Sequence, residues 1–253
     1  MAMEDAQESL VPLLQKTLLS SIDPAVGFQT LFDFVDSVFF FAKDRKGRIL
    51  FANHQLVRHY GFERSEDMIG KTDFDFLPRS LAQKYRWDDE RVVRNKEPLV
   101  RQVELFLDDK GVPDWFFTTK FPLMSNDGKA IGVMGVIQKF DRSHPKFFED
   151  KKLSSIISYL DEHYLDSIHP SELAAISGMS SRKLQRVFKS KLGTTPRDML
   201  MKLRVLKACD HLRLTDRSLS SIAMDCGFYD QSAFSRQFKK HIGLTPRQYR
   251  AGY

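Results

Sequence analysis

The sequence predicts an α+β domain with a five-stranded antiparallel sheet, followed by an all-α domain of two helix-turn-helix units. Its 253 residues favour two domains, since a domain averages roughly 150 residues. Residues 151–253 contain 18 basic residues (Lys and Arg) and 9 acidic residues (Asp and Glu). Residues 1–150 contain 21 basic and 24 acidic residues. Of the 21 phenylalanines, 17 precede residue 151. The basic second part suggests a polyanionic partner, nucleic acid before membrane.

The first domain shows the signals of strands joined by tight turns. Apolar or alternating runs separated by glycine-containing turns are typical of antiparallel strands. The expected strands are Val38–Ala42, Ile49–Ala52, Leu99–Leu107, Trp115–Phe121 and Ile131–Phe140. Asn53 is placed to cap a helix, and a longer helix is expected at about Arg79–Asn95. The sheet is therefore expected to carry helices on one face.

A break in the pattern divides the chain. Pro145 disfavours helical geometry at His144, which predicts a linker. An N-terminal helix at about Ser9–Ser20 carries a stripe formed by Leu10, Leu13, Leu14 and Leu18. This helix is expected either to cover the sheet or to pair with a second chain. The predicted segments are the N-terminal helix region (1–26), the first domain (27–142), the linker (143–150) and the second domain (151–253).

The second domain is an internal repeat. The pattern of residues 173–178 recurs at 222–227, an offset of 49, and that of 184–189 recurs at 234–239, an offset of 50. Each copy predicts a helix, a turn and a second helix. The outer face of the second helix carries polar side chains in both copies. They are Arg182, Gln185, Arg186 and Lys189 in the first, and Gln231, Ser235, Arg236 and Lys239 in the second.

These side chains suit recognition of double-stranded DNA. Arg contacts guanine and Gln contacts adenine through paired hydrogen bonds in the major groove. Lys and Arg around them meet phosphates and supply much of the affinity. A helix of about 18 residues after Pro196 is expected to hold the two units so that they enter successive segments of the groove.

A spaced motif in the second copy identifies a family. The motif consists of Ile222-Ala223, Cys226-Gly227-Phe228, Phe234, Phe238-Lys239, Gly243-Leu244-Thr245-Pro246 and Tyr249. Residues 151–253 resemble the DNA-binding domain of the AraC/XylS family of bacterial transcription regulators. The resemblance implies base contacts from Arg182, Gln185, Arg186, Gln231, Ser232, Ser235 and Arg236. The alternative is that these surface side chains are merely solvated.

A second series of motifs runs through the first domain. It consists of Phe41 to Arg48, Asn53 before a helix that ends at Tyr60-Gly61-Phe62, Met68 to Asp73, Phe121-Pro122-Leu123, Asp127-Gly128 and Gly132-Val133. Residues 27–142 resemble a PAS domain. The resemblance implies a cavity between sheet and helices that takes a ligand or cofactor. The candidate cavity residues are Phe39, Phe41, Tyr85, Phe117 and Val133.

The nature of the cofactor stays unknown, but two kinds are disfavoured. Haem needs an axial ligand on the helix at about 79–95, which contains no histidine, and His54 and His59 lie on an earlier helix. Covalent flavin needs a cysteine, and none precedes Cys209. An uncharged or aromatic small molecule suits the Phe-rich interior. Alternatively, the phenylalanines fill the core themselves.

Other site types find little support. The glycines make no phosphate-binding fingerprint, the histidines make no metal-ligand pattern, and no catalytic constellation is evident, so an enzyme is not expected. Cys209 and Cys226 fall on apolar helix faces and are expected to be buried, inert thiols. Two cysteines without a CxxC pair indicate a reducing cytoplasm. No apolar run is long enough to span a membrane, and the N-terminus does not resemble a signal peptide.

These observations predict a cytoplasmic transcription regulator that binds promoter DNA. Its PAS domain is expected to sense a small molecule and to change DNA binding through a hinge near residues 141–145. A homodimer is expected. Activation is expected rather than repression, because activators are commoner in the family that the second domain resembles. An activator would have RNA polymerase as a partner. The alternative is a ligand-free PAS module that dimerises the chain or receives its signal from a partner protein.

Overall fold

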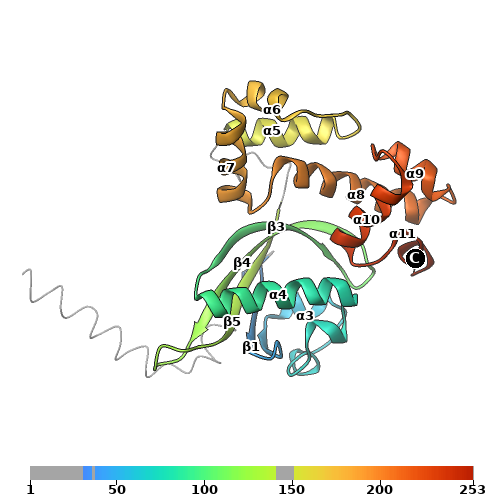
Figure 1. Cartoon of the computed structure of the whole chain (residues 1–253). Helices are drawn as coiled ribbons and strands as arrows, with labels where there is room; N and C mark the ends of the chain where they lie inside the picture. Colours follow the sequence, from blue (N-terminus) through green and yellow to red (C-terminus); the bar gives the residue numbers. More distant parts are fainter. Residues whose placement is uncertain (1–30, 36–37, 141–150, 253) are drawn as a thin grey trace, which may run out of the picture.

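The structure is a computed structural model that describes residues 31–35, 38–140 and 151–252. The expected helix at about Ser9–Ser20 and the expected linker over residues 143–150 lie outside the described residues. Figure 1 shows the sheet and its helices below the helical domain. None of the helices within the described ranges is long and apolar enough to cross a membrane.

The first domain is built on a five-stranded antiparallel sheet with the strand order β2-β1-β5-β4-β3. The strands are β1 (Val38–Asp44), β2 (Ile49–Ala52), β3 (Leu99–Leu107), β4 (Pro113–Met124) and β5 (Ala130–Lys139). The predicted fold class is confirmed, and every expected strand is present. β4 extends beyond the expected Trp115–Phe121 at both ends. Alternation along each strand separates an inner face, which the helices cover, from an outer face.

Helices cover the inner face because short polar signals fix where they begin. They are α3 (His54–His59), α4 (Arg79–Asn95) and two 3₁₀ turns, η1 (Ser65–Asp67) and η2 (Asp73–Asp75). Asn53 caps α3 as expected: its Oδ1 accepts from the Leu56 amide at 3.3 Å and the Phe40 amide at 2.9 Å. Its Nδ2 donates to the Val38 carbonyl at 2.8 Å. One buried side chain therefore ties α3 to β1.

The second domain confirms the repeat. Its helices are α5 (Lys151–Glu162), α6 (Pro170–Ser177), α7 (Ser181–Leu192), α8 (Pro196–Leu214), α9 (Leu219–Asp225), α10 (Gln231–Ile242) and α11 (Pro246–Gly252). The pairs α6–α7 and α9–α10 are the two helix-turn-helix units, and α8 joins them. Gly178 and Gly227 lie in the turns with φ of 61° and 76°, a conformation that glycine adopts without a steric penalty.

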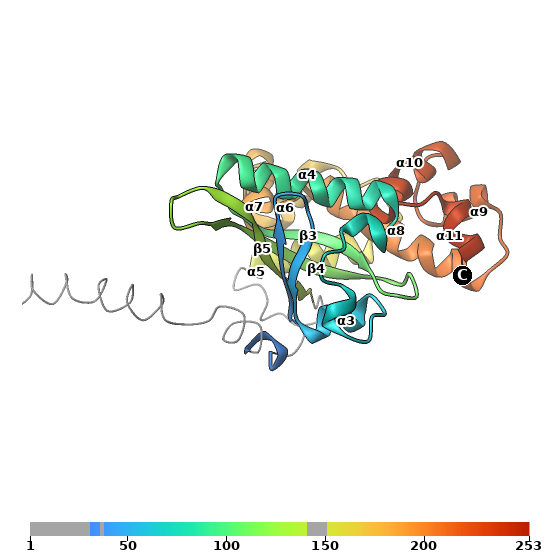
Figure 2. The ribbon, with the colours of Figure 1, turned by 90° about the horizontal axis from the view of Figure 1, so that it is seen from below.

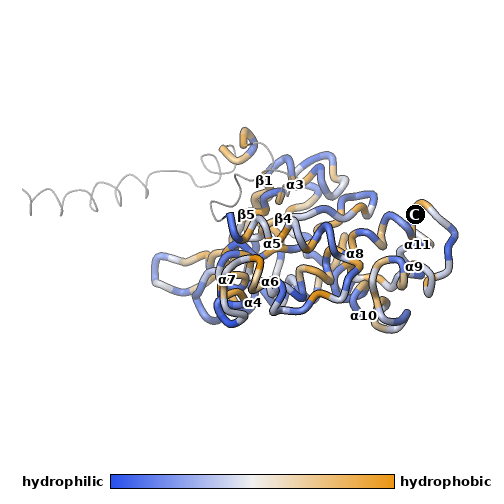
Figure 3. Tube along the Cα trace, turned by 90° about the horizontal axis from the view of Figure 1, so that it is seen from above, coloured by the Kyte–Doolittle hydropathy of each residue, from blue (hydrophilic) through white to orange (hydrophobic). Residues whose placement is uncertain are grey.

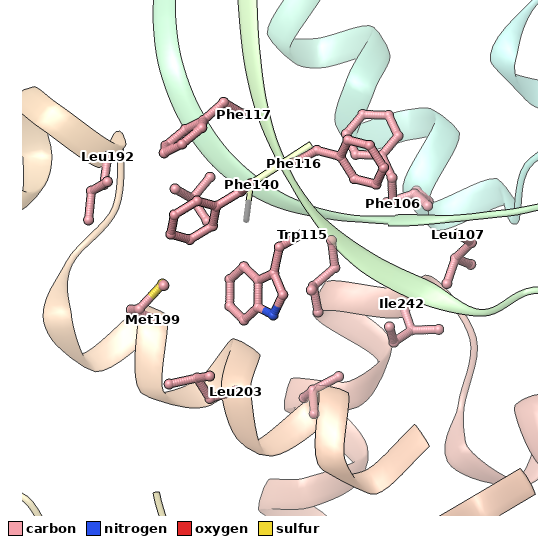
Figure 4. Packing of buried hydrophobic residues seen from close by; sticks show 14 of the residues in the cluster. Phe106, Leu107, Trp115, Phe116, Phe117, Phe140, Leu192, Met199, Leu203 and Ile242 are labelled. Atoms are coloured by element: carbon pink, nitrogen blue, oxygen red, sulfur yellow. The ribbon is translucent and has the colours of Figure 1, made fainter. Parts of the chain in front are cut away.

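The two domains are packed together along the outer face of the sheet. Trp115 and Phe117 of β4 lie against Met199 and Leu203 of α8 (Figure 4). Trp115 and Leu203 have at most 1% of their surface exposed. β3 supplies the rest of this face, because Val103 and Leu105 pair with Phe117 and Trp115. The sequence predicted two separate domains, and this contact between them was not expected.

Close backbone approaches and hydrogen bonds extend the same interface. A Cβ added to Gly193, at the end of α7, would lie 2.8 Å from Gln102 Cα, and one added to Gly243, after α10, would lie 3.0 Å from Leu81 Cβ. The Lys202 ammonium donates to the Val103 carbonyl at 2.8 Å. The Tyr249 hydroxyl donates to the Gly111 carbonyl at 2.9 Å. The ends of both repeat units therefore rest on the first domain.

Replacing Trp115 with Ala tests this shared core. We expect a loss of about 3–5 kcal/mol in the free energy of unfolding, as for other large buried aromatic residues. Because Trp115 lies between the domains, a single denaturant transition in the wild type is expected to split into two. A variant that retains one transition of unchanged midpoint would contradict the interface.

Candidate nucleic-acid interface and sensor cavity

Helix α7 presents a polar face because its apolar residues recur on the opposite side. Ser180 begins the helix, and its Oγ accepts from the Lys183 amide at 3.3 Å. Leu184, Phe188 and Leu192 are buried at intervals of four residues, which leaves the other side to solvent. The expected contact residues on this side are all exposed: Arg182, Gln185, Arg186 and Lys189.

Helix α10 repeats this arrangement. The Asp230 carboxylate caps it by accepting from the Ala233 amide at 2.6 Å, and Phe234 and Phe238 are fully buried. The expected contact residues Gln231, Ser232, Arg236 and Lys239 are exposed, and Ser235 is half-buried. Figure 3 shows α7 and α10 along the same edge of the molecule, with α8 behind that edge.

Helix α8 sets the separation of the two units. Its 19 residues span about 28 Å at 1.5 Å per residue. Buried Leu203 lies at its middle, and the Arg204 guanidinium donates to the carbonyls of Tyr164 and Asp166 at 2.6 and 2.8 Å. These contacts fix α8 against the loop between α5 and α6. This length of α8 is of the order of one turn of DNA, about 34 Å.

An ion cluster joins α8, α10 and the sheet, and the sequence analysis did not find it. Asp198 of α8 pairs with Lys202 at 3.0 Å and with Lys240 of α10 at 2.5 Å. On the first domain, Glu104 of β3 pairs with Lys84 of α4. Burial alone would raise the pKa of Glu104, but the charges of Lys84 and Lys120 lower it to about 2. The acid is therefore ionised at neutral pH and pairs with Lys84.

His241 lies buried at the edge of this cluster. Its Nε2 is 3.9 Å from Asp198 Oδ1, and the cations Lys202, Lys240 and Lys84 also face it. Burial lowers the pKa of His241 to about 3, and the Asp198 carboxylate opposes this shift only in part. The imidazole is neutral in the folded protein at neutral pH.

Acidification is expected to destabilise the fold through His241. Its pKa is about 3 when folded, against 6.5 for an ordinary histidine, so the unfolded chain binds more protons between these values. Stability from this group is complete above pH 6.5 and falls as pH falls toward 3. At pH 5 the loss is about 2 kcal/mol relative to pH 7.5. Denaturant titrations of the wild type and His241→Gln should differ by this amount in their pH dependence. His54→Gln, a change at an exposed position on α3, is the matched control.

The inner face of the first domain contains a small polar cavity of about 30 Å³. Lys43 and Lys120 lie in its wall, paired with Asp73 at 2.6 Å and with Asp89 at 2.5 Å. The Tyr85 hydroxyl also borders it and finds no hydrogen-bond partner among the described residues. The cavity accommodates about two water molecules. The expectation of an uncharged or aromatic ligand in a Phe-rich interior did not include these ion pairs.

The five expected cavity residues do not all meet there. Phe41 and Tyr85 line the cavity. Phe39 lies on the inner face but packs on His59 and Phe116, with ring centres 4.7 and 5.3 Å apart. The two others lie apart from the cavity. Val133 borders a surface hollow beside α4, and Phe117 points to the outer face, where its ring packs on Phe140.

The outer face of the sheet divides into two parts. The half near Trp115 is covered by the second domain, whereas the half near β1 forms an apolar groove of about 470 Å³. Phe121 and Met134 border this groove and are 45% and 38% exposed. Phe32 contributes a ring stacked 4.5 Å from Phe40. Exposed apolar surface of this extent typically marks an interaction site.

Both cysteines are buried, as expected. Burial raises the pKa of Cys226 to about 12 and also raises that of Cys209, so neither thiol ionises readily. Within the described ranges, no group of three or more His, Cys, Asp or Glu side chains could hold a metal ion.

The comparisons with known families match both domains. The family described as a helix-turn-helix domain matches residues 173–252, and the one described as a PAS fold matches residues 34–143. The chain is 36% identical over 103 residues to the HTH-type transcriptional activator RhaS of Escherichia fergusonii, and 35% identical over 103 residues to that of Enterobacter sp.. Each match covers 41% of this chain and 37% of the relative.

Two solved structures are similar to parts of this chain. An AraC-type transcriptional regulator from Chromobacterium violaceum is 33% identical, with 40% of this chain and 89% of that chain covered and a TM-score of 0.38. The structure described as VqmA bound to DPO is 23% identical. The match covers 70% of this chain and 84% of that chain, with a TM-score of 0.41.

The matched families place a PAS domain in front of a helix-turn-helix domain. The second domain is thus a helix-turn-helix domain of the AraC type.

Proposed function

We propose that this chain is a sequence-specific regulator that binds double-stranded promoter DNA through α7 and α10. The observation that carries this proposal is the pair of exposed polar faces on one edge of the molecule, held apart by α8. Two such helices suit adjacent major-groove segments on one side of a duplex.

Each polar side chain has a role that its chemistry supports. Arg182, Arg186 and Arg236 carry the bidentate donors that suit guanine, and Gln185 and Gln231 suit adenine. The remaining positions serve phosphates or local hydrogen bonds. They are Ser232, Ser235, Lys189 and Lys239.

Replacing Arg186 or Arg236 with Ala tests the assigned contacts. Each change should weaken specific binding by about 1–3 kcal/mol and relax the preference at one base position. The measurement is a titration of full-length protein with a duplex enriched by the wild type from a random 30-base-pair pool. Arg58→Ala, an exposed change on α3, is the matched control. Wild-type affinity in both variants would contradict the assignment.

The proposed output is activation of transcription, with RNA polymerase as the partner. Its support is the name of the relatives, which are transcriptional activators. A cytoplasmic location is also proposed, and the two buried free thiols support it because such thiols persist in a reducing compartment.

The PAS domain is proposed to sense a small molecule and to pass the signal to the second domain. The support is the polar cavity with its unpartnered Tyr85 hydroxyl. Ligand entry would move Lys120, whose partner Asp89 lies on α4 and whose charge acts on Glu104. Glu104 pairs with Lys84 of α4, and its neighbour Val103 accepts a hydrogen bond from Lys202 of the second domain. The proposed route runs through β3 rather than through a hinge alone.

The apolar groove favours a second role, in which the PAS domain pairs two chains. The cavity of about 30 Å³ is nearly filled, while the groove near Phe121 and Met134 is open. The occupant that we propose is a second copy of the chain, which would make a homodimer without a ligand.

Native mass spectrometry of full-length protein separates these roles. We expect a dimer for the wild type, and a shift to monomer for Met134→Lys because a charge would then enter the apolar groove. Ile131→Lys, at an exposed position on the same strand outside the groove lining, is the control. Extra mass lost on denaturation would support the sensor role, and a wild-type monomer would contradict the dimer.

A further inference from the structure

Helix α4 of the PAS domain lies beside the two recognition helices. Figures 1 and 2 show α4 on the same side of the molecule as α7 and α10, below them and roughly parallel to the line that joins them. At one end the Ser80 hydroxyl donates to the carbonyl of Gly243, directly after α10. The end of α7 rests on Gln102 of the neighbouring strand.

The solvent side of α4 carries positive charge. Its inner side buries Leu81, Tyr85 and Val92, so residues on the opposite side face away from the sheet. Arg94 is exposed there, and the Arg91 guanidinium lies 5.3 Å from the centre of the Trp87 ring.

Acidic residues of α4 leave this charge largely uncompensated. Asp88 and Asp89 are buried, and Asp89 is neutralised by Lys120. Glu90 is exposed one turn before Arg94, and it is paired with Arg86 at 2.9 Å. Asp88 lies 3.6 Å from Arg91 and is itself 6% exposed. Two of the three acids therefore point into the fold and the third is paired with Arg86, while Arg94 and the half-buried Arg91 reach toward solvent.

The recognition helices continue the same positive surface. The last turn of α7 carries Lys189 and Lys191, and that of α10 carries Lys239 and Lys240. These turns are the ends that approach the first domain. Basic side chains thus extend from both recognition helices toward α4.

We propose that α4 is a third DNA-contacting element, which binds the phosphate backbone beside the grooves entered by α7 and α10. The inference rests on the proposed function. A duplex that crosses both recognition helices runs along the axis of α4, whose 17 residues span about 25 Å. Over that length a duplex presents about 15 phosphates. Arg91 and Arg94 supply the charge, and Trp87 holds the Arg91 guanidinium by a cation–π contact.

This contact makes DNA affinity depend on the docked position of the PAS domain. If the sheet moves away from α8, α4 moves with it and its phosphate contacts are lost, while α7 and α10 keep theirs. The PAS domain then adjusts affinity without changing the bases that are recognised.

The salt dependence of binding tests the proposal in the full-length protein. The double variant Arg91→Gln, Arg94→Gln is compared with Arg58→Gln, Arg64→Gln, which removes equal charge from α3 and the η1 region on a remote part of the PAS domain. The probe is the duplex enriched from a random 30-base-pair pool. We expect the α4 variant to bind about 3- to 10-fold more weakly near 0.15 M salt, with a slope of log affinity against log salt that is smaller by about 1–2. The control should match the wild type.

A charge-conserving variant separates contact from folding. Arg91→Lys, Arg94→Lys should retain most of the wild-type slope, because lysine also meets phosphate. Equal slopes for the Gln variant, the remote control and the wild type would overturn the proposal. Tighter binding by the Gln variant would also overturn it. Failure of the wild type to enrich any duplex would instead reject the proposed function.

Discussion

The packing of the sheet's outer face on α8 is the contact on which the rest of the arrangement depends. Trp115 and Phe117 pack against Met199 and Leu203 (Figure 4). Burial of this apolar surface favours the docked arrangement of the two domains. Because α8 also spaces the two recognition helices, the PAS sheet is packed directly on the element that sets DNA-binding geometry.

Polar groups fix the position of α8 along β3 within this hydrophobic contact. Lys202 is buried yet donates to the Val103 carbonyl, and Asp198 binds both Lys202 and Lys240. A buried charge is tolerated only with such partners. Sliding of α8 along β3 would leave the Lys202 ammonium without its carbonyl. Any signal that shifts β3 therefore changes the free energy of docking, which is the differential contact that coupling between sites requires.

Much of the fold was predictable because its signals are local. Glycine turns, the Asn53 cap and the offset of 49 to 50 residues between repeats fix strands and helices within short windows. The exposed faces of α7 and α10 followed from the same periodicity, because burial of Leu184 and Phe234 determines which side chains face outward.

Contacts between distant residues were not predictable in the same way. Phe117 belongs to the outer face because β4 is paired with β3 in one particular register, and a shift of one residue would reverse its direction. Lys43 and Lys120 were not recognised as cavity residues, since their partners Asp73 and Asp89 are far apart in sequence. The domain interface likewise joins residues separated by about 100 positions, as Val103 and Lys202 show.

A distance measurement between the two domains tests the docked arrangement most directly. Spin labels at Arg58→Cys on α3 and Ser220→Cys on α9 would report it by double electron–electron resonance, with labelled chains diluted in unlabelled protein. Cys209 and Cys226 are buried and should escape labelling. The account predicts one narrow distance distribution, which broadens when Trp115 is replaced by Ala. A broad distribution in the wild type itself would show that the domains move independently and would contradict the account.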